Sequence, residues 1–263
     1  MSDVENINPY GPDDGRDKAG QVEAMFDNIA PAYDLMNRLM TLGIDRLWRN
    51  RAIKLIAKNR HSVRYILDVA SGTGDLAILM ARRLEPVSIT AVDLSTEMLE
   101  VGRSKTAAAG LADLITFSRA DCLQLPFPDD TFDCVTAAYG VRNFENLEAG
   151  YREMFRVMRP GGCLMILELS TPKNKLIRPL YNIYTRHIIP LVGKLVSKDL
   201  SAYSYLPASI EAVPQGREMT TLMTNAGFSN TEFRTMTFGT CTIYLASKAA
   251  DKVLDDVKCP PTA

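Results

Sequence analysis

A glycine-rich turn that joins a strand to a helix is the feature that most constrains the fold of this chain. The apolar run Tyr-Ile-Leu-Asp-Val-Ala at 65–70 predicts a buried parallel strand, and the residues at 75–83 predict a helix. Between them Gly72 and Gly74, followed by Ala77, form the pattern G-x-G-x-x-A. The absence of side chains in such a turn allows a nucleotide-type cofactor to approach the backbone, although a tight turn also requires glycine on steric grounds alone.

Strand and helix patterns alternate after this turn for about a hundred residues, which favours a doubly wound parallel sheet with right-handed crossovers. Further strands are predicted at 88–93, 114–120, 132–138 and 163–169, and further helices at 96–109 and 147–158. Near the C-terminus a helix at 215–226 precedes two strand-like runs, 231–236 and 240–246, that meet near Gly239. We expect these two runs to form an antiparallel hairpin that closes an otherwise parallel α/β sheet.

The same patterns divide the chain into one domain and two terminal segments. Helical spacing between 21 and 58 predicts three short helices, because Pro31 interrupts the first periodic stretch. The Asp-, Gly- and Pro-rich start of the chain is expected to fray unless it docks on the domain. The expected divisions are a flexible N-terminal segment (1–20), a single domain (21–249) made of a helical lid (21–60), a cofactor-binding core (63–171), a cap (172–213) and a closing helix and hairpin (214–249), and a C-terminal tail (250–263).

Composition disfavours several classes of function. A formal net charge of -1 over 263 residues provides no overall attraction for nucleic acid. The five cysteines are scattered without a Cys-x-x-Cys pair, and the only histidines are His61 and His187, so no metal site is expected. The polar residues 1–21 lack the apolar segment of a signal peptide, and no run of about 18 apolar residues is present to span a bilayer. We therefore expect a soluble cytoplasmic protein with free thiols.

Aspartates near the ends of the predicted strands narrow the choice of cofactor. Asp93 ends the second strand, where a carboxylate can accept hydrogen bonds from two ribose hydroxyls. Asp68 and Asp75 flank the turn, where they would repel a pyrophosphate but favour the ammonium and sulfonium groups of S-adenosylmethionine. Asp121 follows the third strand and can accept from an adenine amino group, with the apolar residues 125–127 covering the ring. These acids favour S-adenosylmethionine over NAD.

The core at 63–171 resembles a known superfamily in its whole set of motifs. The glycine turn, Asp93, Asp121 and the strand Phe132–Val135 together are similar to the Rossmann-like class I methyltransferases. The resemblance implies that S-adenosylmethionine binds at the rim formed by the carboxyl ends of the strands. The cofactor-binding residues that it implies are Asp68, Gly72, Thr73, Gly74, Asp93, Leu94, Asp121, Cys122 and Ala138.

Three further stretches carry a narrower resemblance. Phe26–Asn37 with Trp48 beyond it, Tyr139–Phe144 and Arg156–Ser170 resemble signatures of the C-methyltransferases of menaquinone and ubiquinone biosynthesis. The similarity runs over residues 22–248, nearly the whole chain. It implies methylation of a ring carbon in a hydroquinone that bears a polyprenyl tail.

This sequence departs from the family pattern in two places. Thr41 stands where serine is usual, and the usual histidine before Trp48 is absent from Asp45–Trp48, so that histidine has no counterpart here. The ending Phe238–Tyr244 is closer to menaquinone-pathway members than to ubiquinone-pathway members. The resemblance therefore implies demethylmenaquinol as the first choice of substrate, with a methoxy-polyprenyl-benzoquinol or another small molecule as alternatives.

Methyl transfer to a ring carbon requires that a neighbouring hydroxyl be polarised or deprotonated, because carbon is otherwise a poor nucleophile. The resemblance implies that a guanidinium stabilises the phenolate while other groups orient the ring oxygen or a water. The candidate catalytic residues are Arg142, Asn143 and Tyr33, and the candidate substrate-binding residues are Asp34, Asn37 and Tyr139. Structural roles stay open: Tyr33 as a core tyrosine, Asn143 as a helix cap, and Glu168 as a buried hydrogen-bonding group instead of part of the site.

The cap mixes apolar and basic residues and is expected to cover the substrate. Its basic residues are Lys173, Lys175, Arg178, Arg186, Lys194 and Lys198, with Asp199 as the one acid between 173 and 205. A basic amphipathic cap suits peripheral contact with anionic lipid, where a prenylated quinol resides. A helical cover with a solvated basic face explains the same pattern equally well. The oligomeric state, including a homodimer, stays open.

Two other classes of function fit part of this pattern. An NAD-dependent oxidoreductase uses the same glycine turn, but the acidic surroundings disfavour it and no group of residues suited to hydride transfer is evident. A non-catalytic, cofactor-binding subunit of a quinone-biosynthesis assembly would keep the cofactor site without needing Arg142.

Overall fold

Seven strands form one sheet at the centre of the molecule. The computed structural model describes residues 2–59, 63–189 and 201–250. The strands are β1 (Tyr65–Val69), β2 (Ser88–Asp93), β3 (Ile115–Arg119), β4 (Phe132–Ala138), β5 (Met158–Leu169), β6 (Ser229–Met236) and β7 (Cys241–Ser247). Their spatial order is β3-β2-β1-β4-β5-β7-β6, with β1 to β5 parallel and β7 antiparallel to both neighbours. The doubly wound, mostly parallel sheet and its closing hairpin are confirmed.

The strand order reverses between β1 and β4, which positions the site. β1 pairs with β2 on one side and with β4 on the other. At such a switch point an open α/β sheet leaves a crevice beyond the carboxyl ends of its strands. Because β1 ends at Val69 and β4 ends at Ala138, the glycine turn and the residues after Ala138 share this rim.

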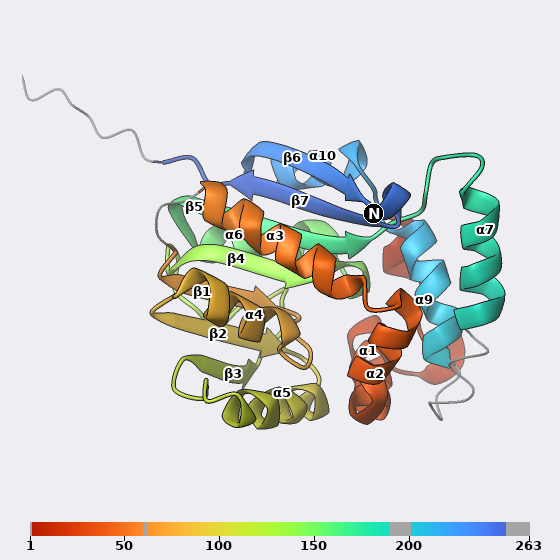
Figure 1. Cartoon of the computed structure of the whole chain (residues 1–263), viewed down its shortest axis with the longest axis horizontal. Helices are drawn as coiled ribbons and strands as arrows, with labels where there is room; N and C mark the ends of the chain where they lie inside the picture. Colours follow the sequence, from red (N-terminus) through yellow and green to blue (C-terminus); the bar gives the residue numbers. More distant parts are fainter. Residues whose placement is uncertain (1, 60–62, 190–200, 251–263) are drawn as a thin grey trace, which may run out of the picture.

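Helices cover both faces of the sheet (Figure 1). One face carries α3 (Asp45–Asn59), α4 (Asp75–Leu84) and α5 (Thr96–Ala108), and the other carries α6 (Leu147–Val157) and α10 (Arg217–Asn225). Trp48 and Met80 are buried against the first face, and Tyr151 and Met219 against the second. The predicted helices of the core are confirmed, since the apolar side of each is the side that packs on the sheet.

Further helices lie at one end of the sheet, beyond the tips of β1 and β4 (Figure 1). They are α1 (Lys18–Ile29), α2 (Tyr33–Thr41), α7 (Arg178–Ile183) with a π-helical turn at Tyr184–Ile188, and α9 (Ser201–Ala212). The predicted break at Pro31 is confirmed, because α1 ends before it and a short 3-10 turn leads into α2. Met25, Met36 and Tyr205 share one core, so the lid and the cap pack on each other. The part of the cap at 190–200 lies outside the described residues.

The N-terminal segment is docked on the domain. Val4 is fully buried in the core that α6 covers, and the Glu5 carboxylate accepts a hydrogen bond from the backbone N–H of Leu147 (3.0 Å). The Lys18 ammonium donates to the carbonyl oxygen of Val4 (2.5 Å). Fraying was expected here unless the segment docks, and Val4, Glu5 and Lys18 supply such docking contacts. The tail lies outside the described residues from 251 onward.

β5 begins at Met158, ahead of the strand expected at 163–169. Met158 pairs with Phe132, and the register shifts between Phe132 and Cys134, so Pro160-Gly161-Gly162 belongs to an irregular extension of the strand and not to a turn. The N–H of Gly161 donates to the carbonyl oxygen of Lys248 (2.9 Å). Pairing with distant segments therefore extends this strand, and local periodicity does not reveal it.

Candidate active site

Three adjoining cavities lie at the rim between the sheet and the lid. The large cavity, of about 320 Å³, lies under the lid and the cap; the middle cavity, of about 70 Å³, lies at the ends of the first strands; and the small hollow, of about 30 Å³, lies beside the glycine turn. Tyr33 and Tyr139 line all three. The cavities therefore meet at these two phenol rings.

Tyr139 stands in a strained backbone conformation at this junction. Its φ of +60° lies in the left-handed region that residues other than glycine rarely adopt. It directly follows β4, and its N–H donates to the carbonyl oxygen of Leu167 on β5 (2.7 Å). Burial raises the pKa of its hydroxyl well above the ordinary value. Strain of this kind persists where surrounding structure imposes it, and it concentrates at functional sites.

The glycine turn has the backbone shape that its sequence predicts. Gly74 has a φ of +75°, and a Cβ there would lie 2.7 Å from the Phe117 ring, so only glycine fits. The N–H groups of Gly72 (2.8 Å) and Ser95 (3.0 Å) donate to the two carboxylate oxygens of Asp93. Burial raises the pKa of Asp93 even though these backbone donors oppose the shift. Asp93 therefore braces the turn while it lines the middle cavity.

The middle cavity brings together the residues expected at the nucleoside end of the cofactor. Its walls include Asp93, Leu94, Asp121, Cys122 and Ala138. The apolar residues at 125–127, expected to cover the ring, are not among its walls. The apolar cover comes instead from the following residues of α1 and of two neighbouring loops: Val22, Phe26, Leu123 and Phe144.

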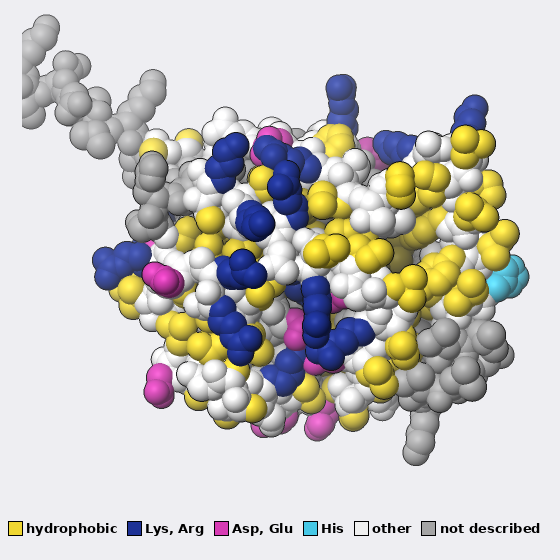
Figure 2. Space-filling model, viewed as in Figure 1, with side chains coloured by type: hydrophobic (Ala, Val, Ile, Leu, Met, Phe, Trp, Pro, Cys, Tyr) yellow, Lys and Arg dark blue, Asp and Glu magenta, His cyan; other side chains and the backbone are white. Residues whose placement is uncertain are grey.

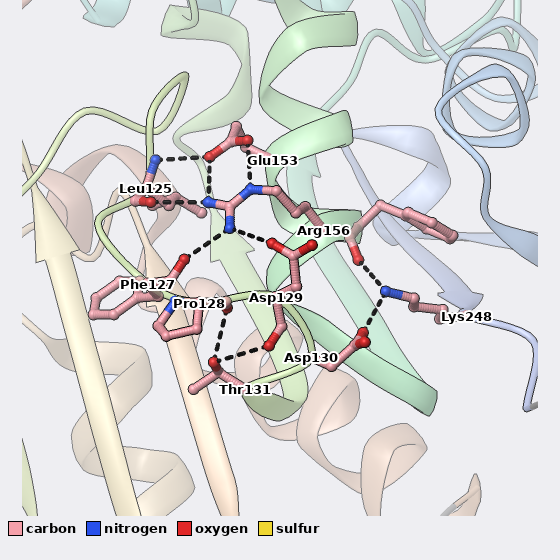
Figure 3. A network of polar contacts seen from close by, with 10 residues as sticks. Leu125, Phe127, Pro128, Asp129, Asp130, Thr131, Glu153, Arg156 and Lys248 are labelled. Carbon is pink, nitrogen blue, oxygen red and sulfur yellow. Dashed lines mark hydrogen bonds and ion pairs between the residues drawn. The ribbon is translucent and has the colours of Figure 1, made fainter.

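Arg156 on α6 binds the loop that carries Leu125 and Phe127 (Figure 3). Its guanidinium donates to the carbonyl oxygens of Leu125 (2.9 Å) and Phe127 (2.7 Å) and pairs with Asp129 (2.8 Å). The Phe127 ring packs edge-on against Phe132, with 5.2 Å between the ring centroids. These bonds hold Leu125 and Phe127 on the core side of the loop, which sequence spacing alone did not predict.

Asp68 is a buried carboxylate with a free oxygen. It is 1% exposed at the end of β1, and its Oδ1 accepts a hydrogen bond from the Thr136 hydroxyl (2.7 Å). Its Oδ2 has no partner among the described residues, and neither has the buried hydroxyl of Ser71, which also lines the small hollow. Burial raises the pKa of Asp68 to about 7. An unpartnered buried carboxylate oxygen fits an ammonium group, so these residues suit the amino-acid end of S-adenosylmethionine.

Asp75 and Asp34, in contrast, are already paired with cations. Lys105 on α5 lies 2.5 Å from a carboxylate oxygen of each and donates to the Thr73 hydroxyl (3.1 Å), which itself donates to Asp34 (2.6 Å). Burial would raise the pKa of Asp75, but Arg49 and Lys105 outweigh it and lower that pKa. Asp75 is thus neutralised locally. Asp34 of α2, expected at the substrate, bonds to Thr73 of the glycine turn and does not line the large cavity.

Arg142 is a buried cation that Glu168 holds in place. It lies in the 3-10 turn after β4, is 6% exposed, and pairs through Nη1 with Glu168 Oε1 (2.9 Å). The same nitrogen donates to the carbonyl oxygen of Tyr139. Burial would lower the pKa of Arg142, but the Glu168 carboxylate outweighs it and raises that pKa. Arg142 lines the large cavity and Glu168 does not, so Glu168 is the counter-ion of Arg142 and not part of the cavity wall.

The other two candidate catalytic residues lie on neighbouring walls. Asn143 lines the middle cavity, and its Oδ1 accepts a hydrogen bond from the Tyr205 hydroxyl of the cap (3.1 Å). It is not a helix cap, because Asn146 caps α6. Tyr33 is half-buried and packs edge-on against Phe26, with 6.0 Å between centroids. Tyr33 is therefore a cavity wall as well as a packing residue.

The large cavity is mostly apolar. The expected substrate contacts Asn37 and Tyr139 both line it. Apolar and aromatic side chains from the lid, α3 and the cap form most of the remaining wall, among them Met25, Met36, Met40, Trp48, Tyr184 and Leu206. Such a wall suits a ring system with a hydrocarbon tail.

Sequence reasoning missed two cations of the site, Arg49 and Lys105. Arg49 pairs with Asp45 one helical turn earlier on α3, and this i,i+4 spacing was the available signal; the same spacing is common on solvated helix faces. Lys105 had no local signal, since its partners lie 30 and 71 residues away.

In the described ranges no three His, Cys, Asp or Glu side chains group as metal ligands. Within those ranges no helix is long and apolar enough to cross a membrane.

The sheet topology and the glycine turn braced by Asp93 are those of the Rossmann-like class I methyltransferase fold. Residues 14–248 match the model of the ubiE/COQ5 methyltransferase family. The chain belongs to this family, which sets aside the interpretation as an NAD-dependent oxidoreductase. The demethylmenaquinone methyltransferase of Bacteroides fragilis is 50% identical over 93% of this chain and 98% of that protein. The Geobacter sulfurreducens ubiquinone/menaquinone biosynthesis C-methyltransferase UbiE is 44% identical over 88% of this chain and 90% of that protein.

Solved structures share the fold at low sequence identity. The [4+2]-cyclase SpnF has a TM-score of 0.65 and 17% identity, covering 88% of this chain and 97% of that chain. An S-adenosylmethionine-dependent methyltransferase of Aquifex aeolicus has a TM-score of 0.54 and 16% identity, covering 75% and 89%. At these identities the similarity shows the fold alone, and one of the two is named for a different chemistry. The family match therefore identifies the chain as a methyltransferase, and the fold is consistent with it.

Proposed function

We propose that this chain transfers a methyl group from S-adenosylmethionine to a ring carbon of a polyprenylated hydroquinone, with demethylmenaquinol as its substrate. The observation that carries the proposal is the meeting, at Tyr33 and Tyr139, of the large apolar cavity with the two smaller cavities, whose walls carry the carboxylates of Asp68, Asp93 and Asp121. Two relatives named demethylmenaquinone methyltransferase, 50% and 45% identical, support the naphthoquinol. The relative named for both quinone pathways keeps the benzoquinol as a second candidate.

The chain's own residues suit each part of the cofactor. Asp93 and Asp121 would hold the ribose and the adenine in the middle cavity, with Leu94, Cys122 and Ala138 as its walls. The backbone of Gly72 and Gly74 would allow the close approach, and Asp68 would face the ammonium. S-adenosylmethionine supplies a methyl group on a positively charged sulfur, so the donor is already activated.

Arg142 would stabilise the ring oxygen next to the carbon that is methylated. Its pKa is raised by Glu168, so it stays a cation and cannot accept the proton. Its Nε has no partner in the described part of the chain and is available to the substrate. A buried guanidinium lowers the pKa of a phenol beside it and stabilises the phenolate. Arg142 therefore increases the electron density of the ring without acting as the base.

A water is the better proton acceptor in this site. Asp45 is the one carboxylate among the described residues that line the large cavity, and both Arg49 and the Thr41 hydroxyl hold it. Asn143 and Asn37 lie on the cavity walls beside Tyr33, where an amide can orient the ring oxygen or that water. In this proposal Arg142 stabilises the negative charge of the phenolate, and Asn143 and Tyr33 orient the ring oxygen or the water.

An apolar rim surrounds the mouth of the large cavity. Leu42 lines that cavity and is 80% exposed, so it marks the opening. Hydrophobic side chains gather on this side of the molecule, around a hollow beside α7 (Figure 2). To this rim we assign the exposed side chains of Leu39, Leu42, Leu180, Ile183 and Phe238, of which Leu42 lines the cavity. Arg38, Lys175 and Arg178, which lie close to these residues in the sequence, are exposed as well. We infer that the rim rests on the anionic surface of a membrane, from which the prenyl tail enters the cavity.

Methyl transfer from a donor labelled in its methyl group tests the proposed function. Demethylmenaquinol should be labelled faster than a 2-methoxy-6-polyprenyl-benzoquinol, and the reverse order would assign the benzoquinol instead. Arg142→Ala should reduce turnover by about a hundredfold while it leaves the affinity for S-adenosylhomocysteine unchanged. Arg152→Ala, which removes an exposed arginine of α6, is the matched control. Full turnover by Arg142→Ala would contradict the role of Arg142, and no transfer to either quinol would contradict the proposal.

A further inference from the structure

Arg49 is a second buried guanidinium of the site, and the proposed reaction leaves it without a ligand. It is 6% exposed on α3 and lines both the large cavity and the small hollow. Its Nη1 bonds to Asp45 and lies 3.7 Å from Asp75, and its guanidinium carbon lies 5.3 Å from the ring centroid of Tyr139. Its Nε is buried and has no partner among the described residues. A buried donor of this kind is costly unless a ligand accepts from it.

The small hollow that Arg49 lines has an unpaired group of opposite charge on another wall. Asp68 contributes a free carboxylate oxygen, and Ser71 contributes a free hydroxyl, both within the described part of the chain. The glycine turn forms a further side. One cationic donor and one anionic acceptor around the same hollow are complementary to a zwitterion, and an amino acid is a zwitterion whose two charges are joined through one carbon.

We propose that Arg49 binds the α-carboxylate of the cofactor's amino-acid end, opposite Asp68, which accepts from its ammonium. The inference rests on the proposed function, because it concerns the cofactor of that same site. Arg142 already supplies a cation to the large cavity but does not line the hollow, whereas Arg49 lines both. A carboxylate bears a full charge and forms a stronger hydrogen bond with a guanidinium than a neutral phenol does. Arg49 is therefore assigned to the carboxylate and not to a ring oxygen of the quinol.

Titration calorimetry with three compounds isolates the carboxylate. S-adenosylhomocysteine keeps both charged groups, decarboxylated S-adenosylhomocysteine keeps only the ammonium, and 5′-methylthioadenosine has neither. Arg49→Gln should lower the affinity for S-adenosylhomocysteine by about tenfold or more, and it should change the affinity for the other two compounds by less than about twofold. Asp68→Asn should weaken both ammonium-bearing compounds and leave 5′-methylthioadenosine unchanged.

The controls separate lost recognition from a damaged fold. Arg49→Gln leaves Asp45 buried without its cation, so the double variant Asp45→Asn/Arg49→Gln is titrated beside it, and the melting temperature of each is recorded without ligand. The double variant should show the same loss of affinity for S-adenosylhomocysteine, with little change for the other two compounds. Asp45→Asn alone keeps Arg49 and should bind all three compounds like the wild type.

Each other outcome has a defined meaning. Equal weakening of S-adenosylhomocysteine and its decarboxylated form by Arg49→Gln would overturn the assignment, since the carboxylate would then not be what Arg49 recognises. Unchanged binding of S-adenosylhomocysteine with a raised KM for the quinol would overturn it in favour of a ring oxygen. If the wild type binds none of the three compounds, the proposed function fails and this inference fails with it.

Discussion

Replacing Asp68 by asparagine should make this protein more stable at neutral and alkaline pH while it weakens the cofactor site. The carboxylate is buried at the end of β1, and its Oδ2 has no partner in the described part of the chain. Burial raises its pKa from 3.8 to about 7. Folding at pH 8 therefore has to accommodate a charge in surroundings that disfavour it.

The pH dependence of this gain follows from the two pKa values of Asp68. A carboxyl group whose pKa is raised by folding destabilises the fold once the pH exceeds its pKa in the unfolded chain. The loss of stability is complete once the pH exceeds its pKa in the folded protein. With 3.8 and about 7 as those values, the loss is about 4 kcal/mol at pH 8 and about 2 kcal/mol at pH 5. Asparagine has the same shape, keeps an acceptor for the Thr136 hydroxyl and does not ionise, so the variant recovers most of this loss.

Urea unfolding followed by circular dichroism at pH 5 and pH 8 measures both gains. Asp133→Asn is the control, for which we expect a stability change of the opposite sign. Burial opposes its ionisation, but hydrogen bonds from the backbone of Tyr65 and Arg64 and from Arg159 lower the pKa of Asp133, so that variant should lose stability at pH 8. An Asp68→Asn protein that gains equally at both pH values, or loses stability at pH 8, would refute burial as the cause. The same protein should bind S-adenosylhomocysteine more weakly than the wild type.

Three further substitutions test other parts of the site. Glu168→Gln removes the counter-charge of the buried arginine and should lower kcat by about tenfold or more with unchanged affinity for S-adenosylhomocysteine, as calorimetry would show. Gly74→Ala introduces a Cβ 2.7 Å from an aromatic ring and should cost about 3 kcal/mol of unfolding free energy. Gly110→Ala is the control, because Gly110 has a φ of +68° and an added Cβ there would have no atom within 4 Å; it should cost about 1 kcal/mol of unfolding free energy. Equal losses of stability in the two variants would exclude the clash with the ring as the cause. Leu180→Ser should reduce co-sedimentation with anionic vesicles at low salt, whereas exposed Val87→Ser should not; equal binding by both would argue against the rim.

The elements of the core could be predicted because short-range patterns encode them. The strands at 88–93 and 132–138 match the structure residue for residue. Ser95 directly precedes the helix predicted at 96–109 and caps α5, because its side chain accepts a hydrogen bond from the N–H of Met98 (3.2 Å). β5 was placed incompletely, because its first residues are extended through pairing with Phe132 and Lys248, which are distant in the sequence. Local periodicity carries no information on such partners.

The candidate site could be predicted to the level of its rim but not to the level of its contacts. Arg142, Asn143 and Tyr33 do lie on the walls of the adjoining cavities. Asp34 was expected at the substrate, yet it pairs with Lys105 and accepts from Thr73. These contacts depend on how α2 and α5 pack against the turn, and helix packing is decided by side chains across the whole interface.

By itself the sequence determined the parallel sheet, the glycine turn and the gathering of Asp68, Asp93 and Asp121 at one edge, since parallel strands end at the same edge of a sheet. The tertiary structure alone decided which acids near the turn are free. Asp75 pairs with Lys105, whereas Asp68 keeps an oxygen without a partner among the described residues. A charge in a folded protein depends on the distances to its neighbours and on its exclusion from water, and folding sets both of them through residues far away in the chain.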